Sequence, residues 1–257
     1  AIPAFAAEDQ TTSDQTTALP KETSTVTVEP EAGVTVSLEF GDITVKNGDG
    51  LDVFVYDGSS AEVKTGDIDA GGKGVLAYNE GTLTVETGDI HAGDEGLYIS
   101  ASGNTAVSTG DIYSVNDGIY VSGNGTIGIT TGDITTDAEG IEAHAYDSGD
   151  LTIETGTIST TGEHTEGSRG IWAEAVDGAS ITVISGAITS TDEYGGIGVY
   201  AMAEDSGSVD VTVNKDDESG IAIDSAVYGA EIYAYNGTSE LTVNGDITAE
   251  NGYGVDL

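Results

Sequence analysis

Apolar and polar residues alternate along most of this chain in short runs, and glycines or small polar residues separate these runs. Residues 81–102, GTLTVETGDIHAGDEGLYISAS, contain three of them. A period of two places successive side chains on opposite faces of a β-strand, whereas an amphipathic helix needs a period near 3.6. The runs are also rich in Val, Ile and Thr, which favour strands. The segment therefore predicts three short strands joined by turns.

The same unit recurs along the chain. Gly-Asp-Ile begins at Gly66, Gly88, Gly110 and Gly132, and each of the three intervals is 22 residues. A fixed period of this size is typical of a solenoid of stacked coils. The glycine before the central strand then marks nine coils, at Gly41, Gly66, Gly88, Gly110, Gly132, Gly156, Gly186, Gly220 and Gly245. Nine coils about 4.8 Å apart predict a rod roughly 43 Å long.

The alternation also predicts which side chains form the core. In the coil above, Leu83 and Val85 of the first strand, Ile90 of the second and Leu97 of the third point inward. Equivalent residues in the other coils would stack on them as three ladders. The intervals after Gly156 lengthen to 30, 34 and 25 residues, and we expect the additional residues to form loops, for example over residues 204–208.

The two ends of the chain differ from the repeats. Residues 1–9, AIPAFAAED, resemble the end of a secretory signal peptide, since Ala4-Phe5-Ala6 fits the small-x-small cleavage pattern; the alternative is an arbitrary Ala-rich terminus. Residues 10–33 are rich in Ser, Thr and acids and predict a linker, and residues 34–257 form the solenoid. Because the sequence stops midway through a strand, we expect the solenoid either to continue beyond Leu257 or to associate end to end.

The composition limits the partners. There are 46 Asp and Glu residues against 6 Lys and Arg, a formal net charge of -40, which disfavours nucleic acid and anionic membranes. No apolar run approaches the roughly 20 residues of a membrane-spanning helix, so no membrane insertion is predicted in this segment. With no cysteine, disulfides and thiolate metal sites are excluded. Together with the leader-like start, these features predict a secreted or cell-surface protein.

A family resemblance follows from the repeated TGDI, the GLY or GIY after it, and the strand that begins with Gly-Thr. Over about residues 34–257 this pattern resembles the right-handed parallel β-helices of the pectin-lyase-like superfamily, especially bacterial autotransporter passenger domains and related surface adhesins. The resemblance implies an all-β, right-handed parallel β-helix of about nine coils of 22 or more residues. It does not fix one function, because the same scaffold carries adhesins, polysaccharide-degrading enzymes and passive stalks.

One acidic residue recurs directly after the glycine turn. Carboxylates stacked about 4.8 Å apart repel one another unless they are protonated, hydrogen-bonded or bridged by a cation. Calcium suits such oxygen ligands, and the alternative is that each Asp caps its own turn. No other cofactor is predicted. The candidate calcium ligands are Asp42, Asp67, Asp89, Asp111 and Asp133.

Aromatic residues recur at outward positions of the third strand. Exposed rings in a file bind sugars or anchor a protein partner, and the alternative is a ladder that only stiffens the rod. The candidate binding residues are Tyr78, Tyr98, Tyr120, His144, Trp172, Tyr200, Tyr233 and Tyr235.

The sequence gives no catalytic residue. Arg169 is the only arginine, and the three histidines are too scattered for a metal motif. We therefore expect an exported, non-enzymatic, adhesin-like module that binds a glycan or a surface protein of a host or neighbouring cell. The alternatives are a carbohydrate-active enzyme of the same fold and a passive stalk or fibre subunit.

Overall fold

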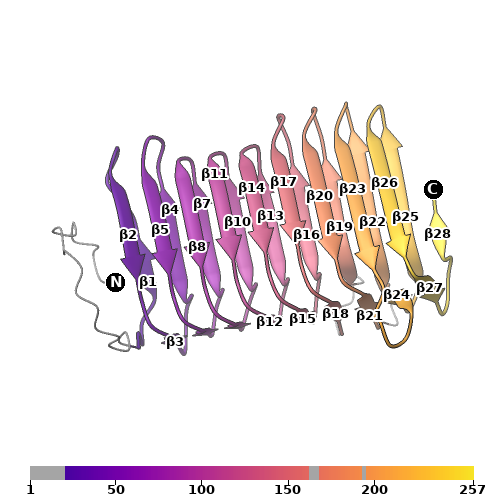
Figure 1. Cartoon of the computed structure of the whole chain (residues 1–257), viewed down its shortest axis with the longest axis horizontal. Helices are drawn as coiled ribbons and strands as arrows, with labels where there is room; N and C mark the ends of the chain where they lie inside the picture. Colours follow the sequence, from indigo (N-terminus) through magenta and orange to yellow (C-terminus); the bar gives the residue numbers. More distant parts are fainter. Residues whose placement is uncertain (1–20, 162–167, 193–194) are drawn as a thin grey trace.

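The protein is an elongated β-solenoid. A computed structural model describes residues 21–161, 168–192 and 195–257, and every regular element in these ranges is a β-strand. The chain advances along the rod from coil to coil, so its colours run in order from one end to the other (Figure 1). About nine turns of about 25 residues each stack in this way, which confirms the predicted fold class.

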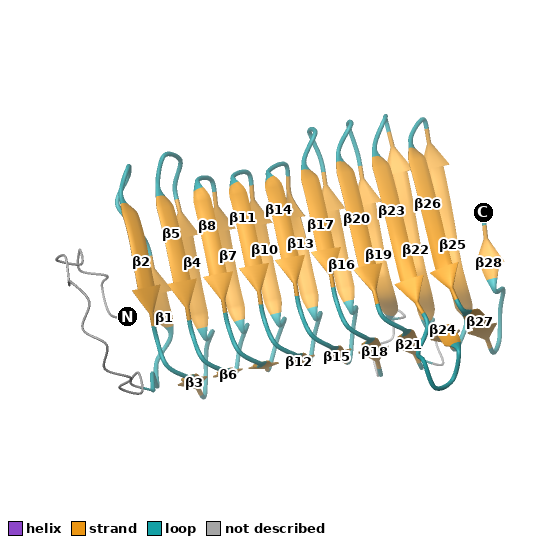
Figure 2. Ribbon diagram, viewed as in Figure 1, coloured by secondary structure: helices purple, strands orange, loops and turns teal. Residues whose placement is uncertain are grey.

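Each coil contributes one strand to each of three parallel sheets, as the strands and connecting loops in Figure 2 show. Sheet I contains β1 (Val26–Val28), β4 (Leu51–Val55), β7 (Val75–Asn79), β10 (Leu97–Ala101), β13 (Ile119–Gly123), β16 (Ile141–Ala145), β19 (Arg169–Ala175), β22 (Ile197–Glu204), β25 (Tyr228–Tyr235) and β28 (Val255–Asp256). Sheet II contains β2 (Thr35–Glu39), β5 (Ser60–Lys64), β8 (Thr82–Glu86), β11 (Asn104–Ser108), β14 (Thr126–Thr130), β17 (Asp150–Glu154), β20 (Ser180–Ser185), β23 (Ser208–Asn214) and β26 (Thr238–Asn244). Sheet III contains β3 (Ile43–Val45), β6 (Ile68–Ala70), β9 (Ile90–Ala92), β12 (Ile112–Ser114), β15 (Ile134–Thr136), β18 (Ile158–Thr160), β21 (Ile188–Ser190), β24 (Ile221–Ser225) and β27 (Asp246–Ala249).

The core consists of ladders of identical or similar side chains. In sheet III, Ile90, Ile112 and Ile134 lie in register on adjacent strands and are fully buried. Leu83 and Val85 in sheet II and Leu97 in sheet I are buried in the same way. Because each coil covers its apolar residues only against its two neighbours, stability comes from nearest-neighbour stacking. The inward residues predicted from the alternation are confirmed.

Two features of the chain ends and intervals differ from the simple repeat. Strand β1 pairs in parallel with β4, so the first strand of the solenoid lies within the 10–33 segment that the sequence indicates as a linker. Residues 1–9 lie outside the described residues. The expected loop over residues 204–208 is not found: β22 and β23 have eight and seven residues where β10 and β11 have five each, and only a tight turn joins them. The longer coil is accommodated partly by these longer strands and partly by a longer connection over residues 215–220, between β23 and β24.

Candidate functional site

The outer surface of sheet I carries a continuous row of rings. Each ring contacts the ring on the next coil, and the centroids of neighbours lie between 4.7 and 6.2 Å apart. The row crosses eight coils, from β4 to β25. We call it the aromatic file, and its members are Phe54, Tyr78, Tyr98, Tyr120, His144, Trp172, Tyr200 and Tyr233.

The file is continuous because each strand of sheet I has two outward columns and the rings step between them. Tyr98 lies opposite Leu76, whereas Tyr78 lies opposite Ser100, so Tyr78 and Tyr98 meet diagonally. Diagonal neighbours on a sheet are within reach of aromatic side chains. Further diagonal steps join Tyr120 to His144, His144 to Trp172, and Tyr200 to Tyr233. None of these steps can be seen from the spacing of the residues along the chain.

The structure changes the membership of the predicted stripe at both ends. Phe54 extends it, since its ring stacks on Tyr78 at 5.7 Å. The signal in the sequence was the outward position of Phe54 in its strand, directly opposite Tyr78. At the other end, Tyr235 is 61% exposed, and within the described ranges no ring contact joins it to the file. The other predicted members all lie in the file.

The rings differ in the surface that they present. Tyr98 and Tyr120 stack face to face at 13°, so they cover each other's faces and expose mainly their edges. Trp172 instead stands nearly perpendicular to both neighbours, at 73° to His144 and 83° to Tyr200. Its indole Nε1–H donates to Glu174 Oε1 at 2.9 Å, which fixes the ring plane. Trp172 therefore makes edge contacts with its neighbours instead of the parallel stacking seen between Tyr98 and Tyr120.

Arg169 and Lys73, which lie against the rings of this surface, are both paired within the chain. The Arg169 guanidinium lies 4.2 Å from the centre of the Trp172 ring and 3.2 Å from the Glu139 carboxylate. Lys73 Nζ lies 4.9 Å from the centre of the Tyr98 ring and forms ion pairs with Asp94, at 3.1 Å, and with Glu95. Cation–π contacts and ion pairs together hold both side chains against the sheet. Their charge is therefore balanced before any ligand arrives.

His144 bridges two carboxylates in the middle of the file. Its Nε2 lies 2.8 Å from Glu142 and its Nδ1 3.2 Å from Glu174. Burial alone would lower the pKa of His144, but the hydrogen bonds to these carboxylates outweigh it and raise the pKa to about 9. The hydrogen bond from His144 likewise lowers the pKa of Glu174. At neutral pH the site thus contains an imidazolium between two carboxylates.

A second acidic group lies at the edge of the same sheet and was not predicted. Burial first, and then the charges of Glu139 and Glu142, raise the pKa of Asp117 to about 8. Burial also raises the pKa of Glu139, against the effect of Arg169. At neutral pH the site therefore holds a protonated carboxyl beside other acids. The sequence signal was a charged residue in the same place of successive coils, directly before the glycine that precedes the sheet I strand: Glu95, Asp117, Glu139 and Arg169.

The Asp column has a direct structural role. Oδ1 of each Asp accepts a hydrogen bond from a backbone N–H of the next coil: Asp67 accepts from Asp89 at 3.0 Å, and Asp89 from Asp111 at 2.9 Å. The same bond begins at Asp42 and, at 2.7 Å, links Asp133 to the N–H of Thr157. The cap is therefore between coils rather than within one turn. In the described part of the chain, no three His, Cys, Asp or Glu side chains cluster in a way that could hold a metal ion, and calcium binding stays a prediction.

Substitution of one member of the column separates its two proposed roles. Asp89→Ala is expected to lower the free energy of unfolding by about 1 kcal/mol, because it removes the acceptor for the Asp111 N–H. Asp89→Asn keeps an acceptor oxygen and removes one repelling charge, so we expect it to be neutral or stabilising at low salt. Urea unfolding of both variants, with and without calcium, provides the measurement. A calcium-dependent stabilisation of the parent protein that Asp89→Asn reduces would instead support an ion ladder.

Comparison of the chain with protein-family profiles, with curated proteins and with solved structures gave no match. The described residues also include no helix long and apolar enough to cross a membrane. The coarse class, a β-solenoid repeat protein, therefore rests on the structure itself. The finer resemblance to autotransporter passengers rests on the sequence pattern.

Proposed function

We propose that this chain is an exported, non-enzymatic binding module of the adhesin type, and that the outer surface of sheet I holds a neutral glycan chain. The observation that carries the proposal is the unbroken series of ring contacts from Phe54 to Tyr233. Seven coil spacings of about 4.8 Å give this surface a length of roughly 34 Å, which suits an extended polymer. Half-buried rings offer it apolar contact area at a low cost in side-chain entropy.

The charges favour a neutral glycan over an anionic one. The file is flanked by Glu142, Glu174 and Glu231, while Arg169 is paired with Glu139 and Lys73 with Asp94 and Glu95. An anionic polymer would meet the repulsion of the whole chain, with its formal charge of -40, while Arg169 and Lys73 beside the file are already paired with carboxylates. Carboxylates and hydroxyls beside apolar rings are well suited to the hydroxyl groups and C–H faces of neutral sugars.

Two places along the file favour specific contacts. At Trp172 the guanidinium of Arg169 covers one face of the indole, and we place a sugar ring on the opposite face. Nearer the N-terminal end, a hollow of about 160 Å³ is lined by Tyr78, Ser100, Asn124 and Tyr146, among others. Tyr78 and Tyr146 are both more than 40% exposed, so the hollow pairs two accessible rings with polar groups. It is a natural end point for a bound chain.

The experiment that tests this proposal is a glycan-array screen of the parent protein, followed by affinity measurements on Trp172→Ala. We expect at least a tenfold loss of affinity for the neutral glycans that bind, because buried aromatic anchors dominate such interfaces. Tyr235→Ala is the matched control, since Tyr235 is an exposed ring of sheet I outside the file, and its affinity should change less than twofold. Equal losses in both variants, or a screen in which only anionic glycans bind, would contradict the proposal.

A carbohydrate-active enzyme of this fold is the second candidate, and Asp117 is the observation that favours it. A protonated carboxyl near ionised ones is the arrangement that acid-catalysed glycoside hydrolysis requires. Incubation of each bound glycan with the protein distinguishes the two functions. Release of reducing ends that Asp117→Asn abolishes, with binding retained, would establish the enzyme. Binding without cleavage supports the module, and a blank array would favour the passive stalk.

A further inference from the structure

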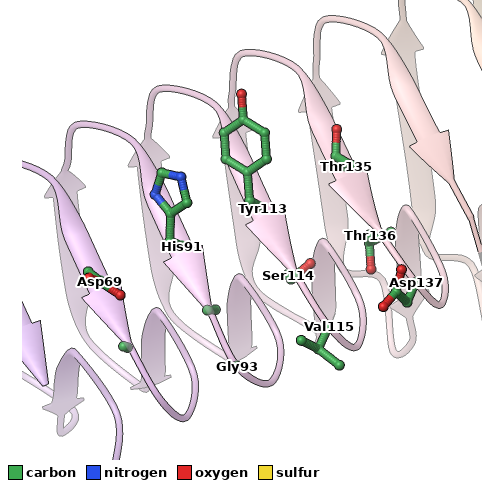
Figure 3. Close-up of a pocket in the computed structure, with 11 residues that line it drawn as sticks. Asp69, His91, Gly93, Tyr113, Ser114, Val115, Thr135, Thr136 and Asp137 are labelled. Carbon is green, nitrogen blue, oxygen red and sulfur yellow. The ribbon is translucent and has the colours of Figure 1, made fainter. Parts of the chain in front are cut away.

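A second surface, on sheet III, has a groove that the proposed glycan site does not use. Its volume is about 370 Å³, and it follows four successive coils from Asp69 to Asp137. Figure 3 shows its outward side chains, with His91 and Tyr113 standing side by side and Thr135 on the next strand. Three coil spacings give it a length of about 14 Å, which matches about four residues of an extended peptide.

The groove exists because the column of the turn after sheet III has no side chain on two successive coils, at Gly71 and Gly93. A Cβ placed on Gly93 would lie 2.4 Å from the carbonyl oxygen of Gly71, so close stacking of the coils admits only glycine there. On the following coil the same column holds Val115, which is 48% exposed, and then Asp137. The floor between this column and the rings is formed by the small residues Ala70, Ala92, Ser114 and Thr136.

The wall of the groove presents one free aromatic face. His91 and Tyr113 stack at 4.7 Å with a 12° angle between their planes, so each ring covers one face of the other. The opposite face of Tyr113 looks toward the next coil, where the residue in register is the short Thr135. Tyr113 is 42% exposed. A flat group can therefore lie on this face, above Thr135 and in the same groove as Asp137 (Figure 3).

The charges specify the kind of group. Asp69 and Asp137 line the two ends of the groove, and none of the described residues that line it is Lys or Arg. Elsewhere the chain twice places a cation of its own between a ring and a carboxylate, at Arg169 with Trp172 and Glu139, and at Lys73 with Tyr98 and Glu95. At Tyr113 the ring and the carboxylate are present, and none of the described lining residues is a Lys or Arg that could lie between them. The complementary ligand is cationic.

We propose that this groove binds a short, extended, basic peptide segment of a partner protein, with an arginine guanidinium on the free face of Tyr113 beside Asp137. The planar guanidinium fits both the ring and the carboxylate better than an ammonium does. The site lies on a different sheet from the aromatic file, so its test is independent of the proposed glycan binding.

The probe is an acetylated and amidated tetrapeptide that contains one arginine among glycines, titrated into the isotope-labelled protein and followed by backbone amide NMR shifts. We expect shifts confined to residues that line the groove, such as Gly93 and Val115, and a fivefold or greater loss of affinity in Tyr113→Ala. That variant leaves the charge unchanged, so it separates this site from general attraction to an acidic rod. Tyr235→Ala, which removes an exposed ring from sheet I outside both proposed sites, is the matched control and should bind as the parent does.

Several results would overturn the proposal. Shifts spread along the acidic surface, or an affinity that Tyr113→Ala leaves unchanged, would mean attraction by net charge alone. A lysine tetrapeptide that binds as well as the arginine one would remove the role of the guanidinium. Shifts produced by a glucosamine disaccharide but not by the arginine peptide would replace the peptide with an amino sugar.

Discussion

The free energy of unfolding of a Gly118→Ala variant is expected to be about 3 kcal/mol lower than that of the parent. We also expect the coils on the two sides of Gly118 to unfold less cooperatively. The Cβ of alanine at this position would lie 2.3 Å from Cγ2 of Ile134 and 2.6 Å from the carbonyl oxygen of Gly140. Neither neighbour can move alone, since Ile134 belongs to the buried ladder of sheet III and the carbonyl of Gly140 accepts the N–H of Ile119. The added methyl group must therefore separate two coils.

Urea unfolding followed by circular dichroism provides the measurement, and Gly128→Ala is its matched control. Gly128 lies in β14, and a Cβ built there meets no atom within 4 Å. Because alanine loses less conformational freedom than glycine on folding, Gly128→Ala should be neutral or stabilising by about 0.5 kcal/mol. Similar stabilities for the two variants would show that the coils are not packed as closely as the structure indicates at Gly118.

The elements and the core could be predicted because a single rule governs them. When equivalent positions stack at one strand spacing, they all face the interior or all face outward, as the position of Ile112 does in its neighbouring coils. The repeat period and the alternation are therefore enough to predict the core. The Thr residues before the glycine turn repeat in the same way: the hydroxyls of Thr87 and Thr109 each donate to the carbonyl of the following glycine at 2.9 Å. Where a coil is longer, the rule gives no answer. The additional residues of β22 and β23 continue the alternation, and only the pairing shows that they extend strands.

The candidate site was less predictable because its contacts are not between equivalent positions. The aromatic file changes column four times, first between Tyr78 and Tyr98 and last between Tyr200 and Tyr233, so its continuity depends on the reach of side chains across the sheet. The protonation of Asp117 depends on its burial by neighbouring coils, and the charges along the sequence do not reveal that burial. Residues that form a repeating ladder can thus be inferred from the sequence, whereas residues that interrupt a ladder can be assigned only from the three-dimensional structure.

Stability is expected to fall as the pH rises from about 6 to 9, by roughly 3 kcal/mol after allowance for solvent screening of these groups. Two groups act in the same direction. Burial and neighbouring acids raise the pKa of Asp117 from 3.8 to about 8, so between these values the folded chain holds a proton that the unfolded chain has released. The pKa of His144 rises from 6.5 to about 9 despite its burial, because of Glu142 and Glu174, and its stabilising charge is complete below 6.5 and lost through 9. Since the folded state binds more protons in both cases, unfolding becomes easier at higher pH.

The measurement is urea unfolding at pH 6, 7.5 and 9 at constant ionic strength, because a charged denaturant would screen the repulsion within a chain of formal charge -40. Asp117→Asn removes the acid that must ionise, so its stability should decline less with pH and exceed that of the parent at pH 9. Asp57→Asn removes the same charge from an exposed turn and should keep the slope of the parent. If both variants flatten the slope equally, general repulsion among the acids, rather than the buried Asp117 carboxyl, causes the dependence. If only Asp117→Asn flattens the slope, the Asp117 carboxyl is protonated at neutral pH. Both proposed functions of this surface must then account for a neutral acid at this position.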